Sequence, residues 1–224
     1  MEIDWNWVRH HLLKKEHIKV YANGKSDSSI RVCVDECLEK ASILAIPKMA
    51  FAEKRIINIK PDSIKVNRTV ALSSRILASY MKGVSHIYFF LVTLGSGIEK
   101  MATKWMTEGE YLHGYILDRI GSFAVESLAE SFEAELRSAY ASKDLSVSMR
   151  FSPGYCDWPI EEQLKLNRLI DFSKAGVHLA ESCMMVPKKS ISAAVGIAPK
   201  GFFPKSKSQC AICNTTDCSY RRDS

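Results

Sequence analysis

His86-Ile87-Tyr88-Phe89-Phe90-Leu91-Val92 is a nearly continuous run of apolar side chains near the middle of the chain. A strand exposed on one face alternates apolar and polar residues, whereas a strand buried on both faces is apolar throughout. We therefore expect this run to form a central strand that is covered on both sides. Thr93-Leu94-Gly95-Ser96-Gly97 follows it and predicts a turn into a helix that begins near Ile98.

The two glycines of that turn leave two interpretations open. Backbone amides at the start of the helix could hold an anion, because they have no partner within the helix. The turn could equally be a plain connection between strand and helix. A Walker loop is excluded, because no Gly-Lys-Ser or Gly-Lys-Thr follows at the required place.

The flanking sequence predicts helices and short strands around this central run. Four short alternating runs between residues 49 and 72 suggest a small antiparallel meander, and residues 190–198 suggest a last strand. The expected fold is one α+β domain with a mainly antiparallel, twisted sheet packed against helices. The helices are expected at residues 2–18, from Ser28 or Ser29 to about 44, from Ser73 or Ser74 to 81, 110–142 and 160–174.

The segment from Glu110 to about Ser142 is the longest expected helix. Apolar residues recur at helical spacing and form one stripe, which predicts the buried face. The stripe consists of Leu117, Ile120, Ala124, Leu128, Phe132 and Leu136. Asp118, Ser122, Glu126 and Glu133 are expected on the opposite face, and Glu130 lies on this polar side. By periodicity alone, Glu130 is a solvated glutamate.

Length and composition predict a cytoplasmic globular protein. The 224 residues are 46% hydrophobic and 25% charged, and no apolar run approaches the roughly 18 residues of a membrane span. The acidic start lacks the apolar core of a signal peptide. Seven cysteines, an odd number, favour a reducing compartment. The excess of Lys and Arg over Asp and Glu is only 31 against 25, without a nucleic-acid motif, so we expect no nucleic acid partner.

Arg150-Phe151-Ser152-Pro153-Gly154-Tyr155-Cys156-Asp157-Trp158-Pro159 combines a cation, two prolines, a glycine and large aromatic residues. Prolines and glycine impose a non-helical path, whose amides and carbonyls can point at a ligand. Arg150 suits a carboxylate or a phosphate. Tyr155 and Trp158 offer ring faces for a flat group or a cationic sulfur. The alternative is an ordinary connection whose aromatic residues fill the core.

This loop resembles the activation domain of cobalamin-dependent methionine synthase, and more closely the short stand-alone relatives of that domain. The matching residues are Arg-x-Ser-Pro-Gly-Tyr from Arg150 and the following Asp157-Trp158-Pro159-Ile160-Glu161-Glu162-Gln163. Three further motifs agree in the same order, and together they cover roughly residues 85–200. They are Thr93 to Glu99, Leu128-Ala129-Glu130-Ser131-Phe132, and Leu179 to Pro187 followed by Lys188-Lys189-Ser190.

The resemblance implies a role in the reductive reactivation of a protein-bound corrinoid. S-adenosylmethionine would methylate cob(I)alamin formed from cob(II)alamin. In this family the motif arginine, here Arg150, holds the methionyl carboxylate, and the helix glutamate, here Glu130, holds the ammonium. Ser152 and Gly154 would contact the ligand through their backbone, and Tyr155 would lie near the ligand and the corrin. The chemistry belongs to the cofactor, and the protein supplies orientation.

The sequence departs from the family pattern at two places. Cys156 stands where the short relatives usually have glycine. The family's aromatic ligand contact after the last strand falls near Phe202 or Phe203, and neither carries a hydroxyl. The chain also contains no Asp-x-His-x-x-Gly motif for cobalamin. We therefore expect the corrinoid partner to be a cobalamin-binding methionine synthase or another corrinoid methyltransferase, with flavodoxin or ferredoxin as electron donor.

The last segment, 205–224, is expected to be a basic, cysteine-containing tail on a domain that spans 1–204. Cys210, Cys213 and Cys218 have C-x2-C-x4-C spacing, which suits zinc or an iron–sulfur cluster with a fourth ligand from Cys156, Cys183 or His178. Free thiols are the alternative. Two other functions remain open, namely a non-catalytic module that binds a corrinoid protein and an iron–sulfur activator that does not use S-adenosylmethionine.

Overall fold

The computed structural model describes residues 2–16, 28–204 and 209–213. Its central element is β5 (His86–Thr93), in which every residue after His86 is buried. β5 pairs on one side with β1 (Lys48–Arg55) and on the other with β9 (Ser190–Pro199). β6 (Leu145–Val147) completes an antiparallel sheet of order β1-β5-β9-β6. The predicted central strand and the antiparallel α+β architecture are confirmed.

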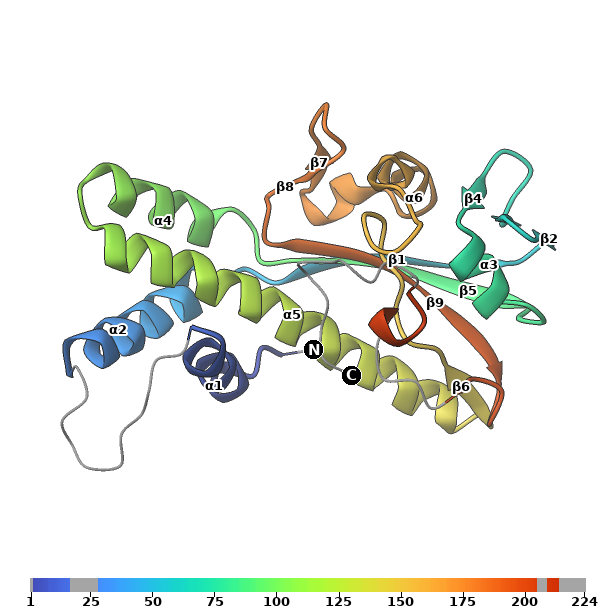
Figure 1. Cartoon of the computed structure of the whole chain (residues 1–224), viewed down its shortest axis with the longest axis horizontal. Helices are drawn as coiled ribbons and strands as arrows, with labels where there is room; N and C mark the ends of the chain where they lie inside the picture. The colour runs from blue at the N-terminus through green and yellow to red at the C-terminus, as the bar shows by residue number, and fades with distance from the viewer. Residues whose placement is uncertain (1, 17–27, 205–208, 214–224) are drawn as a thin grey trace.

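Alternate side chains of β5 enter two separate hydrophobic cores. Phe90 and Val92 face the core formed with the long helices, whereas Phe89 and Leu91 face the other core. The long helices stack against one side of the sheet, with α1 and α2 on the side of α5 that is turned away from it (Figure 1). They are α1 (Trp5–Lys15), α2 (Ser28–Leu44), α4 (Gly97–Thr107) and α5 (Tyr111–Ala141).

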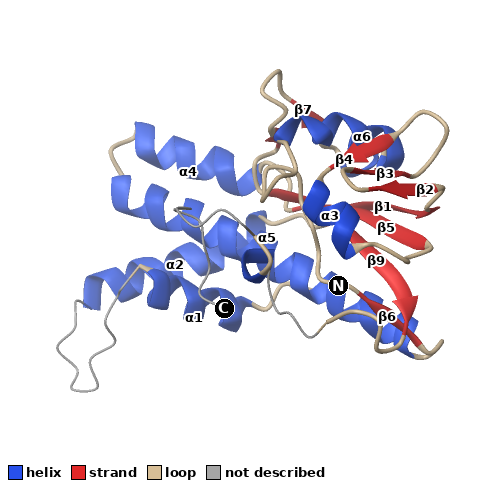
Figure 2. Cartoon of the chain, turned by 45° about the vertical axis from the view of Figure 1, so that its right-hand side comes forward, coloured by secondary structure: helices blue, strands red, loops and turns tan. Residues whose placement is uncertain are grey.

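Shorter elements cover the opposite face of the sheet, as Figure 2 shows. A small antiparallel sheet, β2-β3-β4, lies beside α3 and α6 there. The elements on this side are β2 (Asn58–Lys60), β3 (Ser63–Lys65), β4 (Ala71–Ser73), α3 (Arg75–Tyr80), η1 (Ile160–Glu162), α6 (Gln163–Ile170), η2 (Phe172–Ala175), β7 (His178–Leu179) and β8 (Met185–Val186).

The predicted meander at residues 49–72 is only partly right. Its last three runs form the small sheet, but the first belongs to β1, an eight-residue strand of the main sheet. The predicted helix at residues 160–174 is interrupted at Asp171, whose φ of +58° lies in the left-handed region and ends α6. The glycine turn before α4 packs closely, because a Cβ on Gly97 would lie 2.7 Å from the carbonyl oxygen of Leu44.

Helix α5 carries the predicted apolar stripe on its buried face. The assignment of Glu133 to the solvent-exposed face was wrong, because this residue is buried. Although α5 is 31 residues long, neither it nor any other helix in the described part of the chain is apolar enough to cross a membrane. Its C-terminal half lies against β6 (Figure 1). Glu133 of this half pairs with Arg150, which belongs to the loop that follows β6.

Candidate functional site

Arg150 is held at the edge of the main sheet, because residues before and after it in the sequence pair with β9. Ser148 exchanges hydrogen bonds with Gly196 of β9, through its own N–H (3.0 Å) and through its hydroxyl, which accepts from the Gly196 N–H (2.8 Å). Phe151 exchanges two backbone hydrogen bonds with Ala194, of 2.9 and 2.8 Å. Because β9 is a buried strand, these contacts fix the position from which the guanidinium extends.

The guanidinium of Arg150 lies between two glutamates of α5. Its Nη1 donates to Glu133 Oε1 at 2.9 Å, and its Nη2 donates to Glu126 Oε2. Arg137 also donates to Glu133, from Nη2 to Oε2 at 2.6 Å. The side chain of Arg150 is 16% exposed and that of Glu133 only 7% exposed, so this ion pair is largely removed from water.

Three glutamates of α5 share the face of the helix that meets Arg150. Glu126, Glu130 and Glu133 are spaced by four and three residues, a spacing that aligns side chains along one side of a helix. Burial alone would lower the pKa of the Arg150 guanidinium. The carboxylates of Glu126, Glu133 and Glu130 outweigh that effect and raise the pKa above its ordinary value.

Glu130 is the exposed member of this acidic row, as its position in the helix predicted. Its carboxylate is close enough to contribute to the raised pKa of Arg150. The structure therefore brings together Arg150 and Glu130, which come from different elements and were selected from the sequence. Sequence reasoning did not identify Glu126 and Glu133 as partners of Arg150. The spacing of the three glutamates was the signal that could have indicated them.

The loop after Arg150 closes on itself. The Gly154 N–H donates to the carbonyl of Trp158 at 2.7 Å, and the Tyr155 N–H donates to the carbonyl of Ser152 at 3.3 Å. Gly154 has a φ of +92°, which favours glycine. Because both amides are used inside the loop, a ligand contact at Gly154 would involve its carbonyl.

The aromatic residues of this loop divide between packing and exposure. Trp158 is buried, and its Nε1 points to Glu162 at 3.4 Å, so its ring offers no face to a ligand. Of the two interpretations left open for Trp158, core packing is the one that the structure supports, because the side chain is buried. Tyr155 is 52% exposed. Phe203 stacks on Tyr80 with ring centroids 5.8 Å apart, so it also serves packing.

Asp157 anchors the loop to the start of α3. Its carboxylate accepts hydrogen bonds from the Ser74 hydroxyl at 2.5 Å and from the Arg75 N–H at 2.7 Å. The Ile76 N–H also points at this carboxylate, at 3.3 and 3.4 Å from its two oxygens. The first N–H groups of a helix have no partner within the helix. Asp157 supplies that partner from a distant part of the chain and ties the loop to a rigid element.

The C-terminal residues 209–213 lie against the same loop. Gln209 Nε2 donates to the carbonyl of Arg150, and the thiol of Cys156 contacts Gln209 Oε1 at 3.9 Å. Burial, a hydrogen bond with the Cys213 side chain and the nearby Cys210 raise the pKa of Cys156 to about 12. Cys218 lies outside the described residues. Among the residues that are described, no group of three or more His, Cys, Asp or Glu side chains could hold a metal ion.

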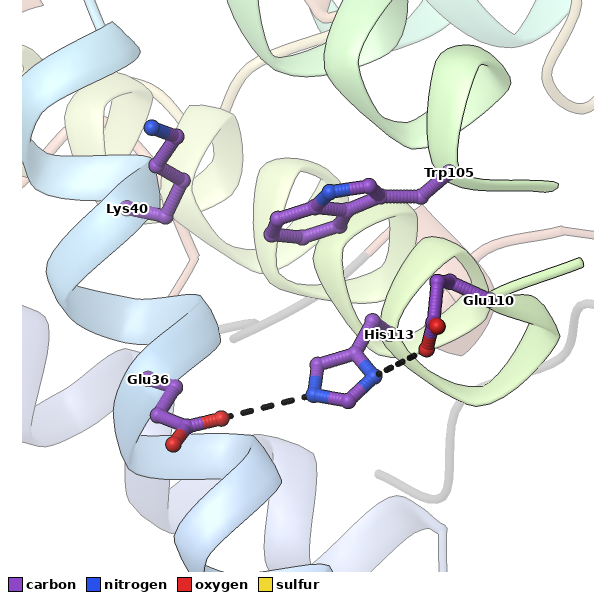
Figure 3. Close-up of a pocket in the computed structure, with 5 residues that line it drawn as sticks. All are labelled: Glu36, Lys40, Trp105, Glu110 and His113. Atoms are coloured by element: carbon purple, nitrogen blue, oxygen red, sulfur yellow. Dashed lines mark hydrogen bonds and ion pairs between the residues drawn. The ribbon is translucent and has the colours of Figure 1, made fainter. Parts of the chain in front are cut away.

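A separate hollow of about 320 Å³ lies where α2, α4 and α5 meet (Figure 3). Trp105 and Lys40 line it together with His113, which lies between two carboxylates. The His113 Nε2 is 3.4 Å from Glu36 Oε2, and its Nδ1 is 3.4 Å from Glu110 Oε2. This hollow lies away from the Arg150 loop.

Arg150, Glu130 and Tyr155 can bind a ligand, but none of them is a source of nucleophilic chemistry, because a guanidinium, a carboxylate in an ion-pair row and a protonated phenol are poor nucleophiles here. The region presents a guanidinium, a row of carboxylates, loop carbonyls and an exposed phenol ring. A planar guanidinium has five N–H donors, and the contacts of Arg150 with Glu126 and Glu133 use two of them. The arrangement therefore suits a ligand that carries both a carboxylate and a cation.

Comparison with known proteins gives a consistent result. Residues 9–204 match the family described as Vitamin B12 dependent methionine synthase, activation domain. Among solved structures, a crystal structure of the MetH reactivation domain bound to AdoHcy is similar, with a TM-score of 0.66 and 17% identity. The match covers 92% of this chain and 75% of that one. No curated protein sequence matched the chain.

Proposed function

Because the chain belongs to the family of activation domains of vitamin B12-dependent methionine synthase, we propose that it reactivates a protein-bound corrinoid. In this proposal it positions S-adenosylmethionine so that the methyl group reaches cob(I)alamin, which a reductant forms from cob(II)alamin. The 224 residues contain no Asp-x-His-x-x-Gly motif for cobalamin. In this proposal the corrinoid is bound by a separate protein, either a split methionine synthase or a related corrinoid methyltransferase.

The observation that carries this proposal is the position of Glu130 on α5, between the two glutamates that pair with Arg150. S-adenosylmethionine has a carboxylate and an ammonium on the same carbon, so it needs a cation and an anion side by side. Arg150 extends from the sheet edge and Glu130 from α5, and their charges interact. A ligand carboxylate would use remaining guanidinium N–H donors, and its ammonium would bind the exposed carboxylate of Glu130.

The loop residues would complete the site around the other parts of the ligand. Tyr155 presents an exposed phenol ring, which can stabilise a sulfonium by about 0.5–2 kcal/mol. The backbone of Ser152 and Gly154 would contact the ligand through carbonyls, because their loop already uses the Gly154 amide. The methyl group passes from the sulfonium to the corrinoid cobalt of the partner, which leaves S-adenosylhomocysteine. The residues of this chain orient the two reactants.

The charge balance of the site predicts a preference for the methylated ligand. The carboxylates of Glu126, Glu130 and Glu133 face the guanidinium groups of Arg137 and Arg150, which leaves one net negative charge. S-adenosylmethionine carries one net positive charge, whereas S-adenosylhomocysteine is neutral. An extra attraction of about 1 kcal/mol between the negative site and the positive ligand lowers the Kd about fivefold.

We therefore expect S-adenosylmethionine to bind several-fold more tightly than S-adenosylhomocysteine at low salt. Salt screens exposed charges, so the preference should shrink as the ionic strength rises. Isothermal titration of both ligands at two salt concentrations measures this difference. Equal or tighter binding of S-adenosylhomocysteine at low salt would contradict the predicted role of the acidic row.

Substitution of Glu130 tests the binding proposal without disturbing the fold. Glu130→Gln removes the charge that would hold the ammonium but keeps the size of the side chain. We expect the Kd for S-adenosylmethionine to rise by about 10- to 100-fold, because a charge-assisted hydrogen bond contributes about 1.5–3 kcal/mol. The thermal midpoint should stay close to that of the wild type, since Glu130 is exposed.

Glu135→Gln is the matched control, since Glu135 is another exposed glutamate of α5 and is not part of the proposed site. It should bind S-adenosylmethionine as the wild type does. If Glu130→Gln also binds normally, the proposed contact is wrong. If the wild type does not bind at millimolar concentration, a non-catalytic module that binds a corrinoid protein, or an iron–sulfur activator, becomes the better interpretation.

The partners follow from this function. The corrinoid protein is the methyl acceptor, and reduction of cob(II)alamin needs a one-electron donor of the flavodoxin or ferredoxin class. We place the reaction in the cytoplasm, where such donors and reduced thiols occur. Zinc or an iron–sulfur cluster at Cys210, Cys213 and Cys218 would be an additional cofactor.

A further inference from the structure

The side chain of Gln209 lies against both ends of the loop that follows Arg150. Its nitrogen, Nε2, donates a hydrogen bond to the backbone carbonyl of Arg150, and its oxygen, Oε1, contacts the thiol of Cys156 at 3.9 Å. Arg150 and Cys156 stand on either side of residues 151–155. A single side chain therefore spans this part of the loop and limits how far its two ends can separate.

The position of Gln209 is itself fixed by the segment that carries it. Gln209 begins a single helical turn, η3 (Gln209–Ala211), and its carbonyl accepts a hydrogen bond from the Ile212 N–H at 3.1 Å. The side chain of Ile212 packs against the hydrophobic core on this side of the sheet. Figure 1 shows this segment as a short red turn beside the loop. Because an apolar contact holds the segment, the amide of Gln209 reaches the loop from an anchored position.

The bridge meets the loop at the two places that would contact the ligand. The carbonyl that Gln209 binds belongs to Arg150, whose guanidinium pairs with Glu133. The thiol that it contacts belongs to Cys156, the direct neighbour of Tyr155 in the sequence. A shift of the loop at either point would move the guanidinium relative to the exposed phenol ring of Tyr155.

The other attachments of the loop do not replace this bridge. Hydrogen bonds within the loop close the turn around Gly154, and Asp157 ties the turn to the start of α3. Neither of these contacts involves the carbonyl of Arg150. Gln209 supplies that contact, and it lies beyond residues 9–204, the region that matches the family.

We propose that Gln209 is a positioning residue, which holds the loop so that the Arg150 guanidinium and the Tyr155 ring face the same ligand. This inference rests on the proposed binding of S-adenosylmethionine. An amide suits the role, because it carries one donor group and one acceptor atom side by side. The C-terminal segment would then belong to the binding unit, although the family match ends at residue 204.

Two variants of the full chain remove the bridge in different ways. Gln209→Glu keeps the size of the side chain, but it sets a carboxylate oxygen against the Arg150 carbonyl, and both groups only accept hydrogen bonds. Gln209→Met keeps a similar length and removes both polar atoms without adding charge. Asn58→Asp is the matched control, because Asn58 is an exposed amide on β2 of the small sheet and the change adds the same charge as Gln209→Glu.

Hydrogen exchange of the free protein measures the loop without any ligand. The Gly154 and Tyr155 N–H groups are bonded inside the loop, so their exchange reports how often the loop opens. We expect this exchange to quicken about threefold to tenfold in both Gln209 variants, since each loses one hydrogen bond. Exchange in α5 should match the wild type, and the thermal midpoint should fall by no more than about 4 °C.

Isothermal titration with S-adenosylmethionine then tests the positioning role. The Kd should rise about threefold to tenfold in both Gln209 variants and should keep its wild-type value in Asn58→Asp. The inference is overturned if the loop of Gln209→Met exchanges like that of the wild type, or if the loop opens more often while the Kd stays the same. Equal losses in Asn58→Asp would also overturn it.

The two measurements separate this inference from the proposed function. A wild type that does not bind S-adenosylmethionine contradicts the proposed function. The exchange of the loop still decides whether Gln209 holds it, because that measurement needs no ligand.

Discussion

Replacement of Arg150 with methionine is expected to destabilise the fold by about 3 kcal/mol, and it should also abolish binding of S-adenosylmethionine. The guanidinium pairs with Glu133, whose side chain is only 7% exposed, and with Glu126. Removing one partner of a buried ion pair leaves an uncompensated charge, which costs about 3–5 kcal/mol. We expect the lower end of that range, because Arg137 still pairs with Glu133.

Chemical denaturation of the wild type, Arg150→Met and Arg150→Lys measures this effect. Lysine keeps the charge but cannot bind two glutamates through a planar fork, so its loss should be intermediate. Arg137→Ala is the control, because the Arg137 side chain is 47% exposed and Glu133 keeps its contact with Arg150, and it should change stability by less than about 1 kcal/mol. If the free energy of unfolding of Arg150→Met lies within about 1 kcal/mol of the wild-type value, the ion pair does not hold the loop on α5.

Replacement of Asp157 with alanine is the second large effect that we expect. The carboxylate satisfies the Ser74 hydroxyl and N–H groups at the start of α3, and Ser74 is buried. Loss of a helix cap costs about 0.5–2 kcal/mol, and a buried donor left without a partner adds about 1–3 kcal/mol. We therefore expect a total loss of about 2–3 kcal/mol.

Thermal and urea unfolding of Asp157→Ala provide the measurement, with Asp35→Ala as the control. Asp35 pairs with Arg9 on the surface at 2.9 Å, and such exposed pairs contribute little. The alanine variant at Asp157 should also bind S-adenosylmethionine more weakly, because the loop loses its attachment to α3. Equal stability of the two alanine variants would show that Asp157 has no special anchoring role.

The features predicted most accurately from the sequence are those that depend on local patterns. The apolar run of β5 required burial on both faces, and Phe89 and Phe90 indeed enter different cores. The apolar stripe of α5 predicted its buried face for the same reason. The length of β1 and the short strand β6 were not predicted, because their positions depend on pairing with distant strands.

The site was only partly predictable. Motifs indicated Arg150 and Glu130, and the structure brings them together. The sequence could not show that Glu133 is buried, because the periodicity of a helix does not reveal what a neighbouring loop covers. It also could not show that residues 209–213 return to Cys156, since that contact joins segments separated by the whole of α6 and β9. The roles of Ser152, Gly154 and Tyr155 toward a ligand stay predictions.

The central claim is most directly tested by a reaction with the corrinoid partner. The chain is mixed with a cobalamin-binding methionine synthase that has been oxidised to its cob(II)alamin form, together with a reductant and S-adenosylmethionine. The visible spectrum should change from that of cob(II)alamin to that of methylcobalamin, and Glu130→Gln should slow this change. A spectrum that stays that of cob(II)alamin with the wild-type chain would contradict the account.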